Sequence, residues 1–246
     1  DAKKSEAAER LFRWLRLNQW IATATVGWIP ITIYDKTQWN PPGCKDWREA
    51  VQLLRGKTCY GGVDLSKSTD LTAFVLVFPP QEGLDRWVAL PTGWMPLDGI
   101  DAREREDHVP YRDWIRAGFL HGCKGDIIDF EDVAYAVVQA ARDYDLRMVG
   151  FDPYLGATVM QRIREALSGT VTEVVEIPQG IRTISPPMKE LERLIRAHEM
   201  LHVHNTAARQ CFLNVRCVSD DNENIKPTKK KSRGRIDLTV GWIIAF

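Results

Sequence analysis

The chain has 246 residues, of which 44% are hydrophobic and 27% charged, a balance that predicts a globular protein with a core of its own and excludes a disordered or fibrous chain. Its 33 basic residues balance its 33 acidic ones, so any site for a polyanion must come from local clustering. No apolar run approaches the roughly 18 residues that cross a membrane, and the N-terminus lacks the apolar core of a signal peptide.

The first 57 residues differ in composition from the rest of the chain. They hold five of the nine tryptophans, around the Pro41-Pro42-Gly43 turn. The pattern predicts a helix near 5–17, an irregular crossing and a short helix near 46–55. Too few apolar residues are in register for this segment to fold alone, so we expect a connector packed on the main domain.

Three short strands are expected next, at residues 58–65, 71–78 and 86–94. The first two are separated by a Lys-Ser-Thr-Asp turn, and a Pro-Pro and a Gly-containing turn precede the third. Consecutive short strands joined by tight turns are typical of an antiparallel meander.

From residue 126 onward helices and strands alternate. Asp129 is a candidate N-cap for a helix whose apolar residues recur with helical spacing, and Ser185 followed by Pro186 is typical of a helix start. Helices are expected near 130–141, 156–167, from 185, and from 236 to the end, and strands over 148–151 and 172–177. A meander followed by this alternation predicts an α/β protein: a ribonuclease H-like mixed sheet flanked by helices on both faces.

Three aspartates stand where such a sheet would gather them. Asp64 ends the first strand, Asp152 follows the strand at 148–151, and Asp237 begins the last helix. The carboxyl ends of neighbouring parallel strands share one crevice, and a helix laid across the sheet could present Asp237 to it. An aspartate at a strand end is more often a turn or cap residue, so the prediction depends on the trio, each directly after an apolar run.

Carboxylates held close together repel one another unless a cation joins them. Hard oxygen ligands suit Mg²⁺ or Mn²⁺, and two such ions about 4 Å apart can promote hydrolysis of a phosphodiester. Asp70 is a weaker fourth candidate ligand that could equally begin the second strand. Asp129 is expected to be an N-cap rather than a ligand.

Basic residues cluster once, in a stretch with Pro and Gly that ends beside Asp237. Its six cations are Lys226, Lys229, Lys230, Lys231, Arg233 and Arg235. Such a cluster can hold a nucleic-acid backbone without reading its sequence, and its position next to Asp237 favours contact with DNA over plain solvated surface.

The histidines and cysteines give weaker indications of function. His202 and His204 could share one face of a strand, but no third ligand stands at a recognisable spacing, so a metal site there is not favoured. The five cysteines lack a C-x-x-C pair and predict free thiols in a reducing cytoplasm, with Cys211 and Cys217 expected on an apolar helix. No phosphate-binding loop of the Walker type is present.

Six segments in chain order resemble the nuclease half of tailed-bacteriophage terminase large subunits: YGGVDLSKSTDLTA, IDFED, VGFDPY, SPPMKELERL, LHVHN and RIDLTVGW. The resemblance runs from about Tyr60 to the C-terminus, and the region of Asn18 and Trp20 resembles the linker after the family's motor domain. It implies two parts: a linker at 1–57, following an ATPase domain that this chain lacks, and a ribonuclease H-like nuclease at 58–246.

What the resemblance implies about function is a metal-dependent endonuclease that cuts concatemeric double-stranded viral DNA during packaging, in the host bacterial cytoplasm. Its metal ligands would be Asp64, Asp152 and Asp237, with a further aspartate in some relatives where Asp70 stands. The implied partners are DNA, the ATPase domain, the small terminase subunit and the portal.

Two other functions remain open from the sequence. An actin-like or sugar-kinase phosphotransferase also has an aspartate on its first strand, but it needs glycine-rich phosphate turns, and residues 66–69 contain no glycine. A non-catalytic DNA-binding packaging module would bind DNA whether or not Asp64 keeps its charge.

Overall fold

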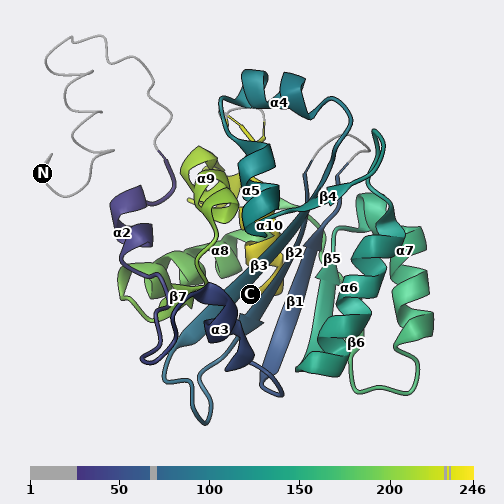
Figure 1. Ribbon diagram of the computed structural model, residues 1–246. Helices are drawn as coiled ribbons and strands as arrows, with labels where there is room; N and C mark the ends of the chain where they lie inside the picture. The colour runs from purple at the N-terminus through teal and green to yellow at the C-terminus, as the bar shows by residue number, and fades with distance from the viewer. Residues whose placement is uncertain (1–26, 67–70, 230–231, 233) are drawn as a thin grey trace, which may run out of the picture.

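The computed structural model describes residues 27–66, 71–229, 232 and 234–246 (Figure 1). Within them a seven-stranded sheet has the order β4-β3-β2-β1-β5-β6, with β7 also paired to β3. Its strands are β1 (Thr58–Asp64), β2 (Thr72–Phe78), β3 (Trp87–Pro96), β4 (His121–Cys123), β5 (Asp145–Phe151), β6 (Glu173–Glu176) and β7 (Met200–His202). A separate hairpin is formed by β8 (Cys217–Ser219) and β9 (Ile225–Pro227).

The predicted meander and the mixed sheet are both confirmed. β1, β2 and β3 pair antiparallel, whereas β1 pairs parallel with β5, and β5 with β6. The ribonuclease H-like fold follows from this topology. In the β1–β5 pair Val63 lies opposite Phe151, so the residues that follow them, Asp64 and Asp152, leave the sheet at the same edge.

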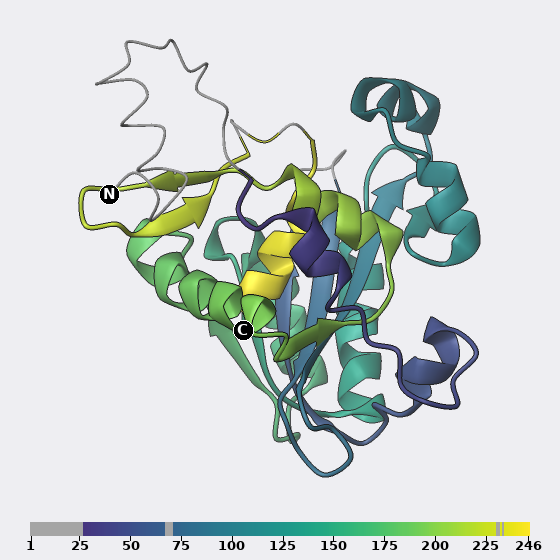
Figure 2. The same cartoon turned by 90° about the vertical axis from the view of Figure 1, so that its left-hand side faces the viewer.

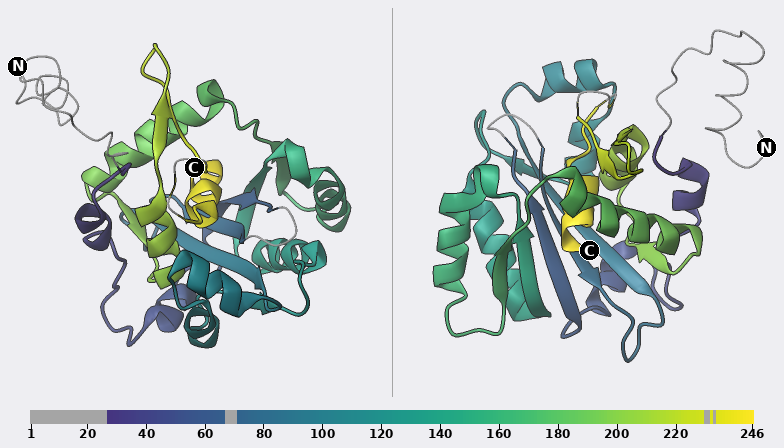
Figure 3. Two further views of the ribbon diagram at one scale, coloured as in Figure 1. Left: turned by 90° about the horizontal axis from the view of Figure 1, so that it is seen from above. Right: turned by 180° about the vertical axis from the view of Figure 1, so that it is seen from behind.

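Helices cover both faces of the sheet (Figures 1 and 3). On one side lie α6 (Phe130–Asp143) and α7 (Pro153–Ala166), and on the other α8 (Ile181–Arg196), α9 (Thr206–Asn214) and α10 (Asp237–Ala245). Four shorter helices complete the described chain: α2 (Ile31–Asp35), α3 (Trp47–Gln52), α4 (Ile100–Asp107) and α5 (Tyr111–Ala117).

The central strand β2 explains why the core has two halves. All seven of its residues are buried, and successive side chains point to opposite faces. Phe74 and Leu76 pack toward α6 and α7, whereas Val75 and Val77 pack toward α8 and α10. A strand that is buried throughout, and apolar everywhere but at Thr72, is what a sheet covered on both faces requires.

The structure corrects several sequence predictions. α7 begins at Pro153, earlier than expected, because Asp152 caps it and proline suits a first turn. α8 begins at Ile181 rather than at Ser185, with both prolines inside it, and Ile184 extends its buried stripe by one turn. Cys217 lies on β8, not on a helix. The helix predicted near 5–17 falls outside the described residues.

Other predictions hold. Asp129 caps α6 by accepting a hydrogen bond from the Glu131 N–H, and the helix near 46–55 is present as α3. All five cysteines are free thiols. Among the helices of the described residues, none has both the length and the apolar character that a membrane crossing needs.

His202 belongs to an aromatic cluster that joins α2 to the sheet and to α10. Its ring stacks on Tyr34 at 4.0 Å between centroids, and its Nε2 lies 3.1 Å from the Tyr34 carbonyl. His204 instead contacts Gln38. The two histidines therefore contact different residues, His202 packing on Tyr34 and His204 bonding to Gln38.

The buried imidazole of His202 predicts a loss of stability in mild acid. Burial lowers its pKa to about 4, from an ordinary 6.5, so between these values the unfolded chain binds a proton that the folded chain excludes. His202 should therefore remove roughly 2 kcal/mol of unfolding free energy between pH 7 and pH 5. Urea unfolding of the wild type and His202→Gln at both pH values measures this, and an equally steep fall in the variant would assign the effect to other groups.

Candidate active site

Two of the predicted aspartates stand at neighbouring strand ends. Asp64 is the last residue of β1, and its side chain is only 7% exposed. Asp152 follows β5 and is half-buried. Its Oδ1 accepts a hydrogen bond from the Tyr154 N–H at 3.0 Å, so this carboxylate caps α7 in the structure.

The third aspartate arrives on α10, which crosses the sheet against β1 and β2 (Figure 2). This close crossing requires glycine at position 62. A Cβ atom there would lie 2.2 Å from the Gly241 carbonyl oxygen and 2.3 Å from the Ala245 nitrogen, both backbone atoms of α10. Gly62 therefore lets the helix rest on the strand, and Asp237, its first residue, enters the site with a side chain 2% exposed.

A lysine joins the two buried carboxylates. Lys229 Nζ lies 3.6 Å from Asp64 Oδ2 and forms a hydrogen-bonded ion pair with Asp237 Oδ1. Burial raises the pKa of Asp64 to about 8; the Lys229 charge opposes this shift, and the charges of Asp237 and Asp152 add to it. The folded site therefore disfavours the ionised form of Asp64, and a single ammonium faces two buried acidic side chains.

Asp64 also has an unsatisfied atom. Its Oδ2 is buried and accepts no hydrogen bond from the described residues, because 3.6 Å to Lys229 is too long for one.

Within the described residues, no three His, Cys, Asp or Glu side chains are gathered as a metal ion would need them. The structure thus unites Asp64 and Asp237, while Asp152 is turned to its own helix. Asp70 lies outside the described residues.

The basic stretch divides into residues with different contacts. Lys226 lies on β9, at the projecting hairpin seen in Figure 2. Arg235 Nε donates to Asp107 Oδ2 at 3.0 Å and to the Tyr111 hydroxyl at 3.2 Å, which fixes the chain just before Asp237. The other three cations fall outside the described residues: Lys230, Lys231 and Arg233.

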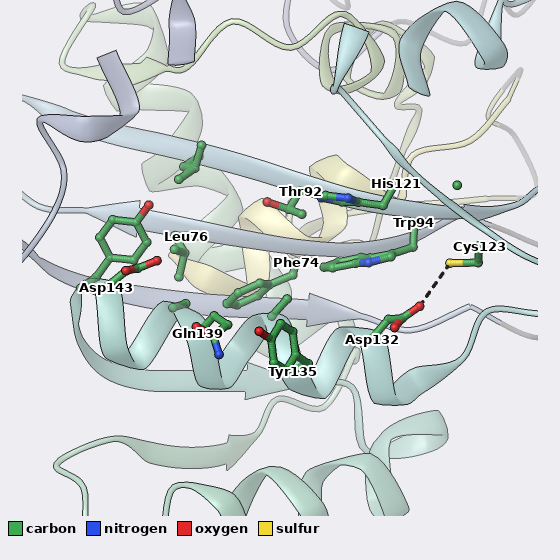
Figure 4. A pocket seen from close by; sticks show the side chains of 15 residues that line it. Phe74, Leu76, Thr92, Trp94, His121, Cys123, Asp132, Tyr135, Gln139 and Asp143 are labelled. Atoms are coloured by element: carbon green, nitrogen blue, oxygen red, sulfur yellow. Dashed lines mark hydrogen bonds between the residues drawn. The ribbon is translucent and has the colours of Figure 1, made fainter. Parts of the chain in front are cut away.

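A groove of about 510 Å³ lies away from these aspartates, between the sheet and α6 (Figure 4). Phe74 and Trp94 form part of its floor, and Tyr135 stands on its helical wall. Cys123 Sγ lies 3.9 Å from Asp132 at one end, and burial raises the pKa of this thiol to about 11, so it stays protonated near neutral pH.

Comparison with known proteins identifies the family. Residues 6–246 match the family described as "Terminase large subunit, endonuclease domain". The chain belongs to this family of terminase endonuclease domains. It is 28% identical over 244 residues to the terminase large subunit of Enterobacteria phage HK97, covering 99% of this chain and 45% of that protein. It is 22% identical over 252 residues to protein YmfN of Escherichia coli strain K12, covering 99% and 53%.

Solved terminase structures share the fold. The HK97 large terminase superposes with a TM-score of 0.76 at 27% identity, over 99% of this chain and 48% of that one. The large terminase nuclease of thermophilic phage G20c superposes with a TM-score of 0.50 at 11% identity, over 78% and 83%, and shows the fold alone. The chain spans about half the length of the curated relatives it matches. The comparisons give no support to the phosphotransferase alternative.

Sequence reasoning missed two residues of this candidate site. Lys229 was predicted only as a DNA contact, although its place eight residues before Asp237 was a signal for pairing with it. Gly62 was not singled out, although a Gly-Gly pair inside a strand often marks a close backbone approach.

Proposed function

We propose that this terminase domain is a divalent-metal-dependent endonuclease that cuts concatemeric double-stranded viral DNA during genome packaging. The observation that carries the proposal is the pair of buried carboxylates, Asp64 and Asp237, held side by side at the edge where β1 and β5 end. Burying two like charges together costs folding free energy, which is typical of a site kept for function rather than stability.

The residues of the site fit Mg²⁺ or Mn²⁺. Carboxylate oxygens are the hard ligands that these ions prefer, and Asp64 Oδ2 is a buried acceptor without a hydrogen-bond donor among the described residues. Asp64 and Asp237 would hold the ions, with Asp152 joining them once it leaves its capping contact. By family resemblance Asp70 would be a further ligand.

When bound, a pair of divalent ions would stabilise the charge on the attacking and leaving oxygens of the phosphodiester. The protein's own residues would contribute by positioning Asp237. Gly62 and Gly241 set the height of α10 above the sheet, and the contact of Arg235 with Asp107 fixes the turn before Asp237. Both features hold Asp237 close enough to Asp64 for one ammonium to contact both carboxylates.

The DNA backbone would be held by the basic stretch. We assign phosphate contacts to Lys226, Lys229, Lys230, Lys231 and Arg233, whereas Arg235, predicted with them, is 17% exposed and bonded to Asp107, which gives it a positioning role instead. These contacts bring affinity without sequence preference.

Charge removal from this stretch should flatten the salt dependence of DNA binding. Each phosphate contact contributes about 0.9 to the slope of log affinity against log salt, so combining K226Q, K230Q and K231Q should reduce it by about 2.7. Fluorescence anisotropy with a short duplex in EDTA measures the slope. A matched control replaces three exposed lysines elsewhere, Lys36, Lys45 and Lys189, by glutamine. Equal slopes in the two triple variants would leave the basic stretch without a DNA role.

The family resemblance also suggests the linked domain, the partners and the location of this nuclease. We propose that residues 1–57 link this nuclease to an ATPase domain, that the small terminase subunit and the portal are its further partners, and that it acts in the host bacterial cytoplasm. The chain matches about half the length of the HK97 large terminase, which supports this wider setting.

Cleavage of supercoiled plasmid tests the proposed function. We expect nicked and linear products with Mn²⁺ and none after addition of EDTA. Binding without cutting, at any Mn²⁺ concentration, would instead favour a non-catalytic DNA-binding packaging module. Cutting that persists in EDTA would remove the metal from the proposal.

A further inference from the structure

Lys229 occupies the space between the two carboxylates that the proposed metals would need. Its ammonium contacts Asp64 Oδ2 and Asp237 Oδ1, and these oxygens face the same point. An ammonium and a divalent cation cannot both lie within contact distance of them, because the two positive charges would repel each other across a few ångströms.

The lysine reaches this point from the solvent side. Its side chain is 54% exposed although the two carboxylates that it contacts are almost fully buried. It follows β9 directly, after Thr228, whose N–H donates to the Arg216 carbonyl at 2.9 Å. The stem of Lys229 can therefore swing outward without disturbing the core.

Resting on the proposed function, we propose that Lys229 is a displaceable counter-cation: it neutralises the carboxylates when no metal is bound, and it must leave them before the ions can bind. Once outside, its ammonium stands at the rim of the site beside Asp237, where a DNA phosphate is the chemically matched partner. Metal binding and DNA binding then each release the same lysine, so each strengthens the other.

The coupling makes two predictions. Removing the ammonium should tighten metal binding, because the ions no longer compete with it. It should also abolish the effect of DNA on metal affinity. A lysine that stayed in place would also repel the ions, so the effect of DNA on metal affinity, and not the tightening alone, distinguishes a displaced lysine from a fixed ion pair.

Manganese binding by the full chain, followed by the electron paramagnetic resonance of free Mn²⁺, tests the proposal without any cleavage readout. We expect Lys229→Gln to bind Mn²⁺ about tenfold more tightly than the wild type, which corresponds to the loss of one competing charge. Lys189→Gln, an exposed lysine on α8 with the same change in charge, should bind within about twofold of the wild type. Equal or weaker binding by Lys229→Gln would overturn the proposal and leave the proposed metal site intact. Failure of the wild type and the variant alike to bind Mn²⁺ would overturn both.

A second measurement uses only the wild type, in case Lys229→Gln folds poorly. Limited acetylation, mapped by mass spectrometry, reports how accessible each lysine amine is. We expect Lys229 to be modified at least threefold faster in saturating Mg²⁺ than in EDTA, while Lys189 reacts at the same rate in both. An unchanged rate at Lys229 would show that the lysine stays between the carboxylates, contrary to the proposal.

Discussion

Asp64→Asn should abolish DNA cleavage and at the same time make the metal-free protein more stable. The loss of cleavage is expected to exceed about a hundredfold, since even residues that only orient metal ligands contribute 10–100-fold. The gain in stability follows from burial. Asp64 lies beside Asp237 with one ammonium between them, and the raised pKa of Asp64, about 8, means that its ionised form opposes folding at neutral pH.

Asparagine keeps the shape of the side chain and removes the buried ionisable group, leaving Lys229 paired with Asp237 alone. We expect the melting temperature in EDTA to rise by roughly 5 °C. Asp129→Asn is the matched control, because asparagine also caps a helix and Asp129, the N-cap of α6, accepts its hydrogen bond from the Glu131 N–H rather than from Lys229. It should leave cleavage and melting temperature unchanged. A melting temperature that falls in Asp64→Asn would mean that the carboxylate stabilises the fold and is not under electrostatic strain.

Gly62→Ala should disrupt the site through a single methyl group that touches no carboxylate. The added Cβ would meet backbone atoms of α10 at 2.2 and 2.3 Å, and backbone cannot rotate away as a side chain can. Lifting the helix costs at least about 3 kcal/mol of unfolding free energy by comparison with other overpacked cores. It also moves Asp237 away from Asp64, and a shift of 1 Å in a reacting group can cost about a hundredfold in rate.

Thermal unfolding and plasmid cleavage on the same preparation measure both effects. Gly180→Ala serves as the control, because its Cβ would meet only the Thr183 hydroxyl at 3.9 Å, and its φ of −67° suits alanine. Near wild-type stability and cleavage in Gly62→Ala would contradict the close crossing of α10 over β1.

The order of the elements could be predicted from the sequence because each has its own local signal. β2 is apolar at six of its seven positions and lies between turn residues, and α6 has a capping aspartate and helical spacing. The start of α8 was predicted wrongly because Pro186 is typical of a first turn, while the packing of Ile184 against the core extends the helix past it. Tertiary contacts outweigh local propensity at such a boundary.

The candidate site could be predicted only in part. Strand ends and the last helix pointed to Asp64, Asp152 and Asp237, because sheet topology determines which ends share an edge. The contact of Lys229 with Asp64 joins residues far apart in the sequence, and the contact of Arg235 with Asp107 depends on the position of α4. Neither has a periodic pattern, so only the folded chain reveals them.

A crystal of this domain soaked in Mn²⁺ and measured for anomalous scattering tests the central claim most directly. We predict anomalous peaks at the carboxylates of Asp64 and Asp237, with Lys229 withdrawn from between them, and no such peaks in Asp64→Asn. Strong peaks elsewhere on the molecule, with the Asp64–Lys229–Asp237 contact unchanged at saturating Mn²⁺, would contradict it.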